Sequence, residues 1–269
     1  MTPLPPRHQS PPIALTIAGS DSGGGAGLQA DLRTFMAFEV HGCSALTCVT
    51  AQNTCGVERV DALPPAALLA QLEAVRSDLA VAALKTGMLL NAELIHCVAE
   101  FVGRWPIARV IDPVMVSRTG AVLLQPEALD AIRLTLLPLA DLLTPNLHEA
   151  ALLTGIELVD AAAVEQAAIR LGAMGPKAVL IKGGGEARWG GRDLFWHQGR
   201  VQWLAGQRVD TPHSHGSGCT LSAAITANLA RGQSLPEAIE RARRYVRSAL
   251  QQSLAIGQGQ GPLCHWVSP

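Results

Sequence analysis

IALTIAGSDSGGGAG, residues 13–27, contains the unit from which the fold is predicted: an apolar strand, a glycine-rich loop and the start of a helix. The loop matches neither common phosphate-binding pattern. Counting from Gly19, Gly25 stands where a Walker A loop needs lysine. Counting from Gly23, Leu28 replaces the last glycine of the dinucleotide fingerprint. Since glycine lets backbone approach a ligand closely, two interpretations remain: a loop facing a ligand other than a nucleotide, or a flexible turn.

The same strand-then-helix unit recurs along the chain. Strands are expected at 13–18, 44–50, 80–85, 108–112, 141–143 and 178–182, and helices at 26–38, 68–78, 91–103, 126–136, 146–154, 161–173, 219–231 and 236–252. A hairpin turning at Gln198 and Gly199 is expected to join strands 193–197 and 200–204. This alternation predicts a single α/β domain with a doubly wound, mostly parallel sheet flanked by helices.

Polar side chains gather where the expected strands end. They are Ser20, Asp21, Gln52, Asn53, Lys85, Asp112, Asn146, Glu149 and Lys182. In doubly wound sheets, ligands bind beyond the carboxyl ends of the strands. The pattern therefore predicts one ligand site at that edge of the sheet.

The composition excludes several classes of protein. The chain has 269 residues, 48% of them hydrophobic and 16% charged, with a formal net charge of −1. Without a long basic run, binding to nucleic acid or to a membrane surface has no electrostatic basis. No apolar run reaches transmembrane length. The six cysteines contain no C-x-x-C pair, which favours a reducing cytoplasm over a disulfide framework or a zinc site.

The chain ends are expected to lie outside the folded domain. Residues 1–12 hold five prolines and lack the apolar core of a secretory signal, so we interpret them as a disordered tail. No interdomain linker interrupts residues 13–255, which we expect to form one domain. Residues 256–269 are expected to be a C-terminal tail.

A second glycine-containing loop precedes a strong helix start. Gly216, Ser217, Gly218 and Cys219 lead directly into TLSAAI. Consecutive backbone N–H groups at a helix N-terminus bind anions. The alternative is an ordinary glycine-containing loop. The flanking His213 and His215 are interpreted as loop histidines, because the sequence shows no further ligands for a metal there.

At this loop the sequence resembles a known family. Ribokinase-like small-molecule kinases carry a G-[AST]-G-D anion hole here, and one branch, the hydroxymethylpyrimidine/phosphomethylpyrimidine kinases (ThiD proteins) of thiamine synthesis, has cysteine instead. HGSGCTLSAA follows that branch. Six further segments match it in order: LTIAGSDSGGGAGLQADLRTF, ALTCVTAQNT, LKTGML, VIDPVMVSRTG, LLTPNLHEAALLTG and VLIKGGG. The resemblance spans about residues 13–255. His213-Ser214-His215 departs from the commoner Asn-Thr-His, with little effect expected.

The resemblance implies that the first glycine-rich loop, including Gly19, lines the pyrimidine site. The family's pyrimidine contact maps onto Gln52, whose amide offers both a donor and an acceptor to an aminopyrimidine edge. Met88 and Val114 would supply apolar walls, and Asp31 belongs to the family's first motif. Simpler alternatives stay open. Gln52 could cap a loop, Met88 and Val114 could be core residues, and Asp31 could be a carboxylate on a helix surface.

The resemblance also places the ATP phosphates at Gly216–Cys219, with Asn146 and Lys182 as further ATP contacts. Asp112 and Glu149 suit Mg²⁺, which takes one or two carboxylates and keeps several waters. The alternatives are a surface lysine for Lys182 and, for Glu149, a first-turn carboxylate favoured by the helix dipole.

The resemblance implies that Cys219 takes part in the reaction itself. A helix N-terminus lowers a thiol pKa, so Cys219 is expected to accept the proton of the substrate hydroxyl, or at least to orient that hydroxyl. The alternative is a buried helix-start cysteine without chemistry.

The implied activity is phosphoryl transfer from ATP to hydroxymethylpyrimidine and then to its monophosphate. A pyridoxal or pyridoxine kinase of the same fold is one rival. A non-catalytic pyrimidine-binding regulator is another. Relatives suggest a homodimer.

Overall fold

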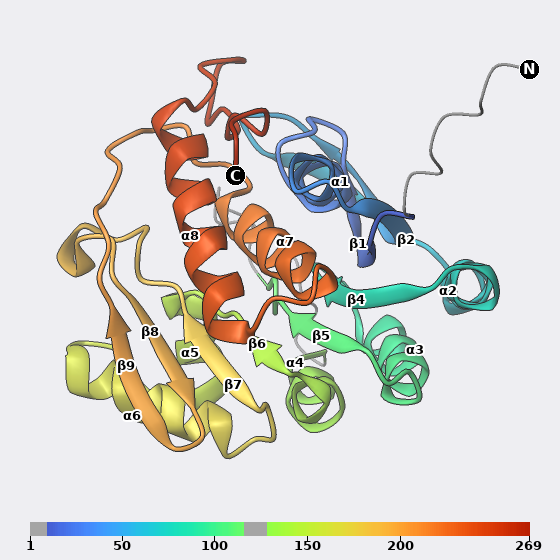
Figure 1. Cartoon of the computed structure of the whole chain (residues 1–269), viewed down its shortest axis with the longest axis horizontal. Helices are drawn as coiled ribbons and strands as arrows, with labels where there is room; N and C mark the ends of the chain where they lie inside the picture. The colour runs from blue at the N-terminus through green and yellow to red at the C-terminus, as the bar shows by residue number, and fades with distance from the viewer. Residues whose placement is uncertain (1–9, 116–127) are drawn as a thin grey trace, which may run out of the picture.

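A computed structural model describes residues 10–115 and 128–269 as a three-layer α/β arrangement (Figure 1). The strands are β1 (Ile13–Asp21), β2 (His41–Gln52), β3 (Val57–Ala62), β4 (Val81–Thr86), β5 (Ala108–Ile111), β6 (Leu142–Leu143), β7 (Ala178–Ile181), β8 (Asp193–His197) and β9 (Arg200–Leu204). The helices are α1 (Gly27–Ala37), α2 (Pro65–Asp78), α3 (Ala92–Gly103), α4 (Ala128–Ala131), α5 (Leu147–Thr154), α6 (Ala161–Gly172), α7 (Ser217–Ala230) and α8 (Leu235–Gln251).

The strands of the described chain form one nine-stranded sheet in the order β3-β2-β1-β4-β5-β6-β7-β8-β9. β1, β2, β4, β5, β6 and β7 pair in parallel, and antiparallel strands close both edges. The predicted doubly wound, mostly parallel sheet is therefore confirmed. The strand order reverses between β1 and β4, and the crevice at the carboxyl ends beside such a reversal is where ligands bind.

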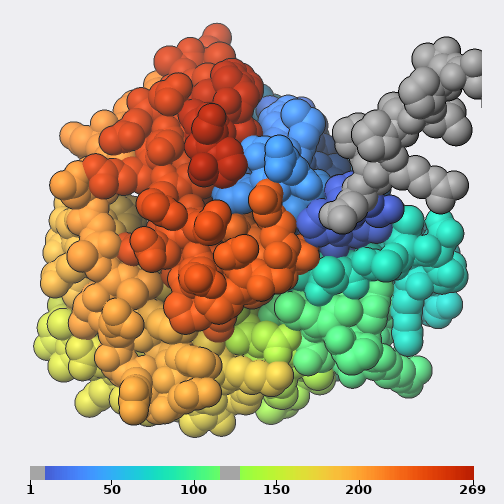
Figure 2. Space-filling model, viewed as in Figure 1, coloured from blue at the N-terminus to red at the C-terminus, as the bar shows by residue number. Residues whose placement is uncertain are grey.

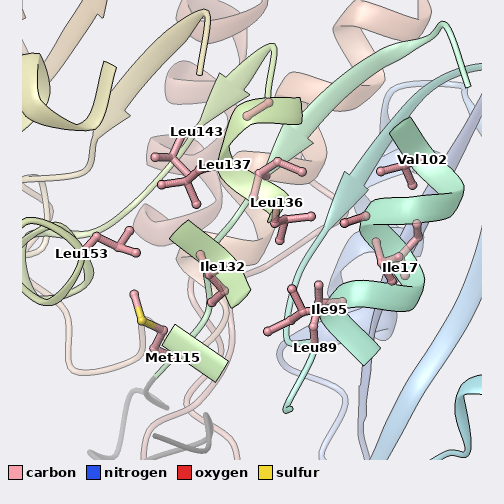
Figure 3. Close-up of a cluster of buried hydrophobic side chains, with 14 of the residues drawn as sticks. Ile17, Leu89, Ile95, Val102, Met115, Ile132, Leu136, Leu137, Leu143 and Leu153 are labelled. Atoms are coloured by element: carbon pink, nitrogen blue, oxygen red, sulfur yellow. The ribbon is translucent and has the colours of Figure 1, made fainter. Parts of the chain in front are cut away.

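The sheet separates two hydrophobic clusters because neighbouring residues on a strand face opposite ways. On β5, Val110 packs into the cluster beneath α1, α7 and α8, whereas Ile111 packs into the cluster on the other face. Figure 3 shows part of this second cluster, where Leu143 of β6 and Ile95 of α3 are among the labelled side chains. The rigid sheet between two packed faces fixes the loops at its ends.

Two short elements differ from the sequence-based expectation. β3 was missed because VERVDA is largely exposed at the sheet edge and lacks a hydrophobic face. The helix expected at 126–136 begins outside the described residues; from Ala128 it forms α4 and continues as a π-helical turn, Ile132–Leu136. Residues 1–9 of the expected N-terminal tail also lie outside the described ranges.

The last residues pack against the domain. Leu263 and Cys264 are buried in the cluster beneath α7 and α8, and His265 is also buried. Figure 2 shows this dark red segment lying against α8 and the blue surface of α1. The expected tail at 256–269 thus contributes to the core. Among the described helices, none is both long and apolar enough to cross a membrane.

Candidate active site

One cavity of about 1260 Å³ opens at the carboxyl ends of the parallel strands. Of the residues that were assigned a catalytic, binding or metal role, all but Asp31 line it: Gly19, Gln52, Met88, Asp112, Val114, Asn146, Glu149, Lys182, Gly216, Ser217, Gly218 and Cys219. Two of the strand-end side chains expected at the same site, Asn53 and Lys85, do not line it. Drug-sized ligands occupy cavities of about 300–1,000 Å³. The space is therefore large enough for a nucleotide beside a small second substrate.

The anion loop meets the first glycine-rich loop directly. Gly216 adopts φ 83° just before α7, and a Cβ there would collide with the carbonyl oxygen of Gly25. Only glycine fits this position, because it tolerates a left-handed backbone and leaves room for the other loop. In the described chain, α7 has no side-chain cap, and the Ser217 N–H donates to the Ser214 carbonyl at 3.2 Å. The N–H groups of the cavity-lining Gly218 and Cys219 are the ones that a ligand can use.

Lys182 points at this helix start from the end of β7. Its Nζ lies 3.3 Å from where a Cβ on Gly218 would be. It also pairs with Asp112 Oδ1 at 2.8 Å and lies 3.9 Å from Glu149 Oε2. Burial opposes its charge, but the two carboxylates outweigh burial and raise the pKa of Lys182. Lys182 is thus a cation fixed in place by two carboxylates, and the alternative that it is an ordinary surface lysine is excluded.

Asp112 stays ionised beneath Lys182. Burial favours its neutral form, but Lys182 and Lys85 outweigh burial and lower its pKa. Its second oxygen accepts a hydrogen bond from Ser222 Oγ at 2.9 Å. Ser222 lies on α7, so the carboxylate links the end of β5 to the helix that carries the anion loop.

Glu149 is both a helix cap and a buried acid. Its Oε2 accepts from the Asn146 N–H at 2.7 Å, and its own N–H donates to Asn146 Oδ1 at 2.8 Å, which makes a capping box. Burial, reinforced by Asp112 and only partly offset by Lys182, raises the pKa of Glu149 to about 7. Glu149 is therefore a carboxylate in the first turn of α5, as the alternative predicted, but it also lines the cavity.

Cys219 differs from expectation in its protonation. We expected the helix N-terminus to lower the thiol pKa, but burial raises it to about 11, with Lys85 opposing that shift. The thiol is therefore neutral at pH 7 in the ligand-free protein. Burial is the largest cause of the higher thiol pKa, Asp31 and Asp112 add to it, and a hydrogen bond from the Gly27 N–H opposes it only weakly.

Asp21 and His215 form a connection between the two loops that sequence reasoning missed. Asp21 accepts the N–H groups of Gly23, Gly25 and Ala26 at 2.8–3.0 Å, and its Oδ2 lies 2.9 Å from His215 Nε2. Burial raises its pKa, but these hydrogen bonds outweigh burial and lower it. The signal in the sequence was an aspartate inside the glycine-rich loop, which ties the loop's backbone together.

Gln52 completes this cluster. Its Nε2 lies 3.3 Å from His215 Nε2, and its Oε1 accepts from Thr50 Oγ1 at 3.2 Å. A His215 Nε2–H that donates to the Asp21 carboxylate cannot also accept from an amide N–H. The Gln52 amide consequently keeps a donor for a ligand in the cavity.

The opposite wall is apolar and closely packed. A Cβ on Gly19 would come within 2.7 Å of both Met88 Cε and Cys48 Sγ. Met88 and Val114 line the cavity as well, although Met88 is almost fully buried. Met88 is therefore both a core residue and part of the cavity wall.

Asp31 requires a correction. Its side chain is fully buried, does not line the cavity, accepts from Thr16 Oγ1 at 2.6 Å and pairs with Lys85 Nζ at 2.8 Å. Both predictions for Asp31, a substrate contact and a carboxylate on the helix surface, are therefore wrong. α1 turns Asp31 toward β1 and β4, where a buried lysine from a distant strand neutralises it.

A family model described as phosphomethylpyrimidine kinase matches residues 21–264. The chain belongs to the phosphomethylpyrimidine kinase family. It is 58% identical over 256 residues to the hydroxymethylpyrimidine/phosphomethylpyrimidine kinase of Synechococcus elongatus, covering 95% of this chain and 97% of the relative. The resemblance found in the sequence motifs is thereby confirmed.

Solved structures of this family and of its neighbours share the fold. A Bacillus subtilis pyridoxal kinase in an ADP complex superposes with a TM-score of 0.88 at 37% identity, covering 95% of this chain and 98% of that one. A phosphomethylpyrimidine kinase from Clostridium difficile gives 0.78 at 38% identity, covering 88% and 99%. The ribokinase-like fold is therefore shared by kinases of two related small heteroaromatic substrates.

Proposed function

We propose that the protein transfers the γ-phosphoryl group of ATP to the hydroxymethyl oxygen of 4-amino-5-hydroxymethyl-2-methylpyrimidine, and then phosphorylates the monophosphate again, in thiamine biosynthesis. One observation carries the proposal: a single cavity has two chemically different ends. At one end lie the first turn of α7, which has no side-chain cap, and Lys182, which is paired with Asp112. At the other end lie the Gln52 amide and the apolar side chain of Met88. This combination suits a phosphate donor facing a small aromatic acceptor.

At the phosphate end, the N–H groups of Gly218 and Cys219 would bind phosphoryl oxygens, and Lys182 would neutralise the charge that develops during transfer. Asn146 lies beside Lys182 at the neighbouring strand end, where the two residues form a β-bridge. Positioning and charge stabilisation of this kind account for most catalysis of phosphoryl transfer.

Asp112 and Glu149 suit Mg²⁺. No group of three or more possible metal-ligating side chains exists among the described residues. Two carboxylates beside bound phosphates are nevertheless a usual donor set for Mg²⁺, which keeps several waters. When bound, the ion would supply positive charge to the phosphate oxygens. Asp112 is ionised beforehand, whereas Glu149 must release a proton near neutral pH.

At the pyrimidine end, Gln52 would donate to a ring nitrogen and accept from the neighbouring amino group. Gly19 allows the ring to approach the backbone of β1, and Met88 with Val114 would cover its faces. The neutral Cys219 thiol would hold the substrate hydroxyl in line with the γ-phosphate. The proton of the substrate hydroxyl passes to an oxygen of the transferred phosphoryl group as the new phosphorus–oxygen bond forms and the bond to ADP breaks, because the neutral thiol is not available as a base.

A coupled ATP assay with hydroxymethylpyrimidine, its monophosphate, pyridoxine and pyridoxal tests the proposal. We expect both pyrimidines to be turned over with higher kcat/KM than the pyridoxine compounds. The structural match to pyridoxal kinases favours that activity as a second candidate. A higher kcat/KM for pyridoxine would replace our assignment. Tight pyrimidine binding without product would instead identify a regulator.

We further propose a cytoplasmic homodimer. All six cysteines are free thiols, which suits a reducing compartment. Light scattering of the purified protein measures the assembly, and a monomeric mass at assay concentration would contradict the dimer.

A further inference from the structure

The segment after α8, residues 253–265, crosses the top of the site; we call it the C-terminal strap. Its first contact lies on the pyrimidine side. Gly259 N–H donates to Thr54 Oγ1 at 3.1 Å, and Gln260 N–H donates to the Thr54 carbonyl at 2.8 Å. Thr54 follows Gln52 by two residues, so the strap holds the turn that carries the pyrimidine-side amide.

The second contact lies on the anion loop. His215 N–H donates to the Gly261 carbonyl at 3.2 Å, and Gly261 N–H donates to His213 Nδ1 at 3.1 Å. His215 and Pro262 form a short parallel bridge, and a Cβ on Gly25 would meet Pro262 at 3.1 Å. The strap therefore touches both glycine loops where they meet.

The third contact is on the first turn of α7. Thr220 Oγ1 lies 2.9 Å from His265 Nε2, and both residues are buried. Burial, with Arg33 nearby, lowers the pKa of His265 to about 4, so the imidazole is neutral at pH 7. The Tyr245 hydroxyl donates to the His265 carbonyl at 2.7 Å, which ties the main chain at His265 to α8. Thr220 follows Cys219, so this bond fixes the turn that presents the thiol.

The strap also forms part of the cavity wall. Gln260 lines the cavity, and its Oε1 is buried without a hydrogen-bond partner in the described chain. Buried polar atoms normally have a hydrogen-bond partner, so this unpaired acceptor in a cavity-lining residue is unusual for a segment that only covers the core.

We propose that the C-terminal strap is a positioning element of the active site, which sets the anion loop and Cys219 relative to the pyrimidine side through the Thr220–His265 bond. This inference rests on the proposed kinase activity. A displacement of about 1 Å at a reacting group can cost 10²-fold in rate. Loss of the bond should therefore reduce kcat even where the fold survives.

Thr220→Val tests the bond, with Thr226→Val as its matched control. Both threonines are fully buried on α7, but Thr226 Oγ1 bonds only the Ser222 carbonyl of its own helix. We expect Thr220→Val to lower kcat about 10- to 100-fold while Thr226→Val keeps it, with similar losses of Tm. Thr220→Ser, which retains the hydroxyl, should restore most of the rate.

Equal kcat for Thr220→Val and Thr226→Val at matched Tm would overturn the proposal, as would a Thr220→Ser protein no better than Thr220→Val. His265→Leu combined with Thr220→Val should be no slower than either single variant, because both remove one bond; additive losses would contradict it. Trp266→Ala, next to the strap and 74% exposed, should leave kcat unchanged. If the wild-type protein itself turns over neither pyrimidine, the proposed function fails instead.

Discussion

The two ends of the cavity are built from different interactions. At the phosphate end, the buried Asp112 and Glu149 carboxyl groups lie 2.8 Å and 3.9 Å, respectively, from the partly buried Lys182 Nζ. At the pyrimidine end, Gln52 and Met88 present an amide and an apolar wall. The first end is preorganised by charge and the second by shape and hydrogen bonding.

This difference assigns separate tasks to the two ends. Charge fixed in a buried site stabilises a transition state strongly, because no reorganisation is needed when the reaction occurs. A neutral amide in a close-fitting pocket discriminates between substrates. Variants at the phosphate end should therefore change kcat, and variants at the pyrimidine end should change KM for the pyrimidine.

Lys182→Met should have the largest effect. It removes the cation beside the anion loop and leaves Asp112 and Glu149 without their partner, so we expect kcat to fall about 10²–10³-fold. Steady-state kinetics with saturating ATP measure it. Lys177→Met, at an exposed lysine, is the control and should retain wild-type kcat. A Lys182→Met protein that changes only the pyrimidine KM would break the division of tasks.

Cys219→Ala should come next. Because the thiol is neutral, we expect the loss of an orienting group, about 10- to 100-fold in kcat, with the ATP KM nearly unchanged since the backbone donors remain. Bound pyrimidine should protect Cys219 against alkylation. A general base typically contributes about 10²–10⁴-fold; a loss above 10³-fold would favour the base hypothesis, and retention of more than half the rate would remove Cys219 from the reaction.

Gln52→Ala tests the other end. Losing a buried hydrogen-bond partner costs about 1–3 kcal/mol, which corresponds to a 5- to 150-fold higher pyrimidine KM. The ATP KM and the kcat at saturating pyrimidine should stay close to wild type. An unchanged pyrimidine KM would exclude Gln52 from the pyrimidine contact.

Glu149→Gln should have the smallest effect on rate and a measurable effect on stability. The variant should need more Mg²⁺ for its half-maximal rate, and a magnesium dependence identical to wild type would refute the metal role. A glutamine oxygen can still accept from the Asn146 N–H, so the helix cap is preserved.

The stability effect of Glu149→Gln depends on pH in a defined direction. The pKa of Glu149 rises from 4.5 to about 7 on folding, so the wild-type folded state binds more protons in this window and its unfolding free energy falls as pH increases through it. Without Mg²⁺, the variant should gain stability relative to wild type between these pH values and keep a constant advantage above pH 7, at most about 3 kcal/mol. Thermal melts at pH 5 and pH 8 measure it; equal Tm differences would contradict it.

The sequence predicted the parts of the site that repeat a local pattern. Strand ends and glycine loops predicted that Gln52, Lys182 and Gly216 lie together, because each follows a recognisable strand or precedes a helix, and all three line the cavity. Pairings between distant residues could not be predicted. Asp31 was assigned to the substrate site, with a helix-surface carboxylate as the alternative, because its partner Lys85 lies 54 positions away. The thiol pKa of Cys219 depends on burial that no local pattern reports.

The contact between the two loops also has a consequence for biosynthesis. Asp21 and His215 are 194 positions apart, and the C-terminal strap contacts His215 and approaches the glycine loop at Gly25. A nascent chain still attached to the ribosome can complete β1 and its glycine loop early, but it lacks the residues that hold that loop in place. The substrate site can therefore form only after the residues of the strap have been synthesised, long after the glycine loop that they contact.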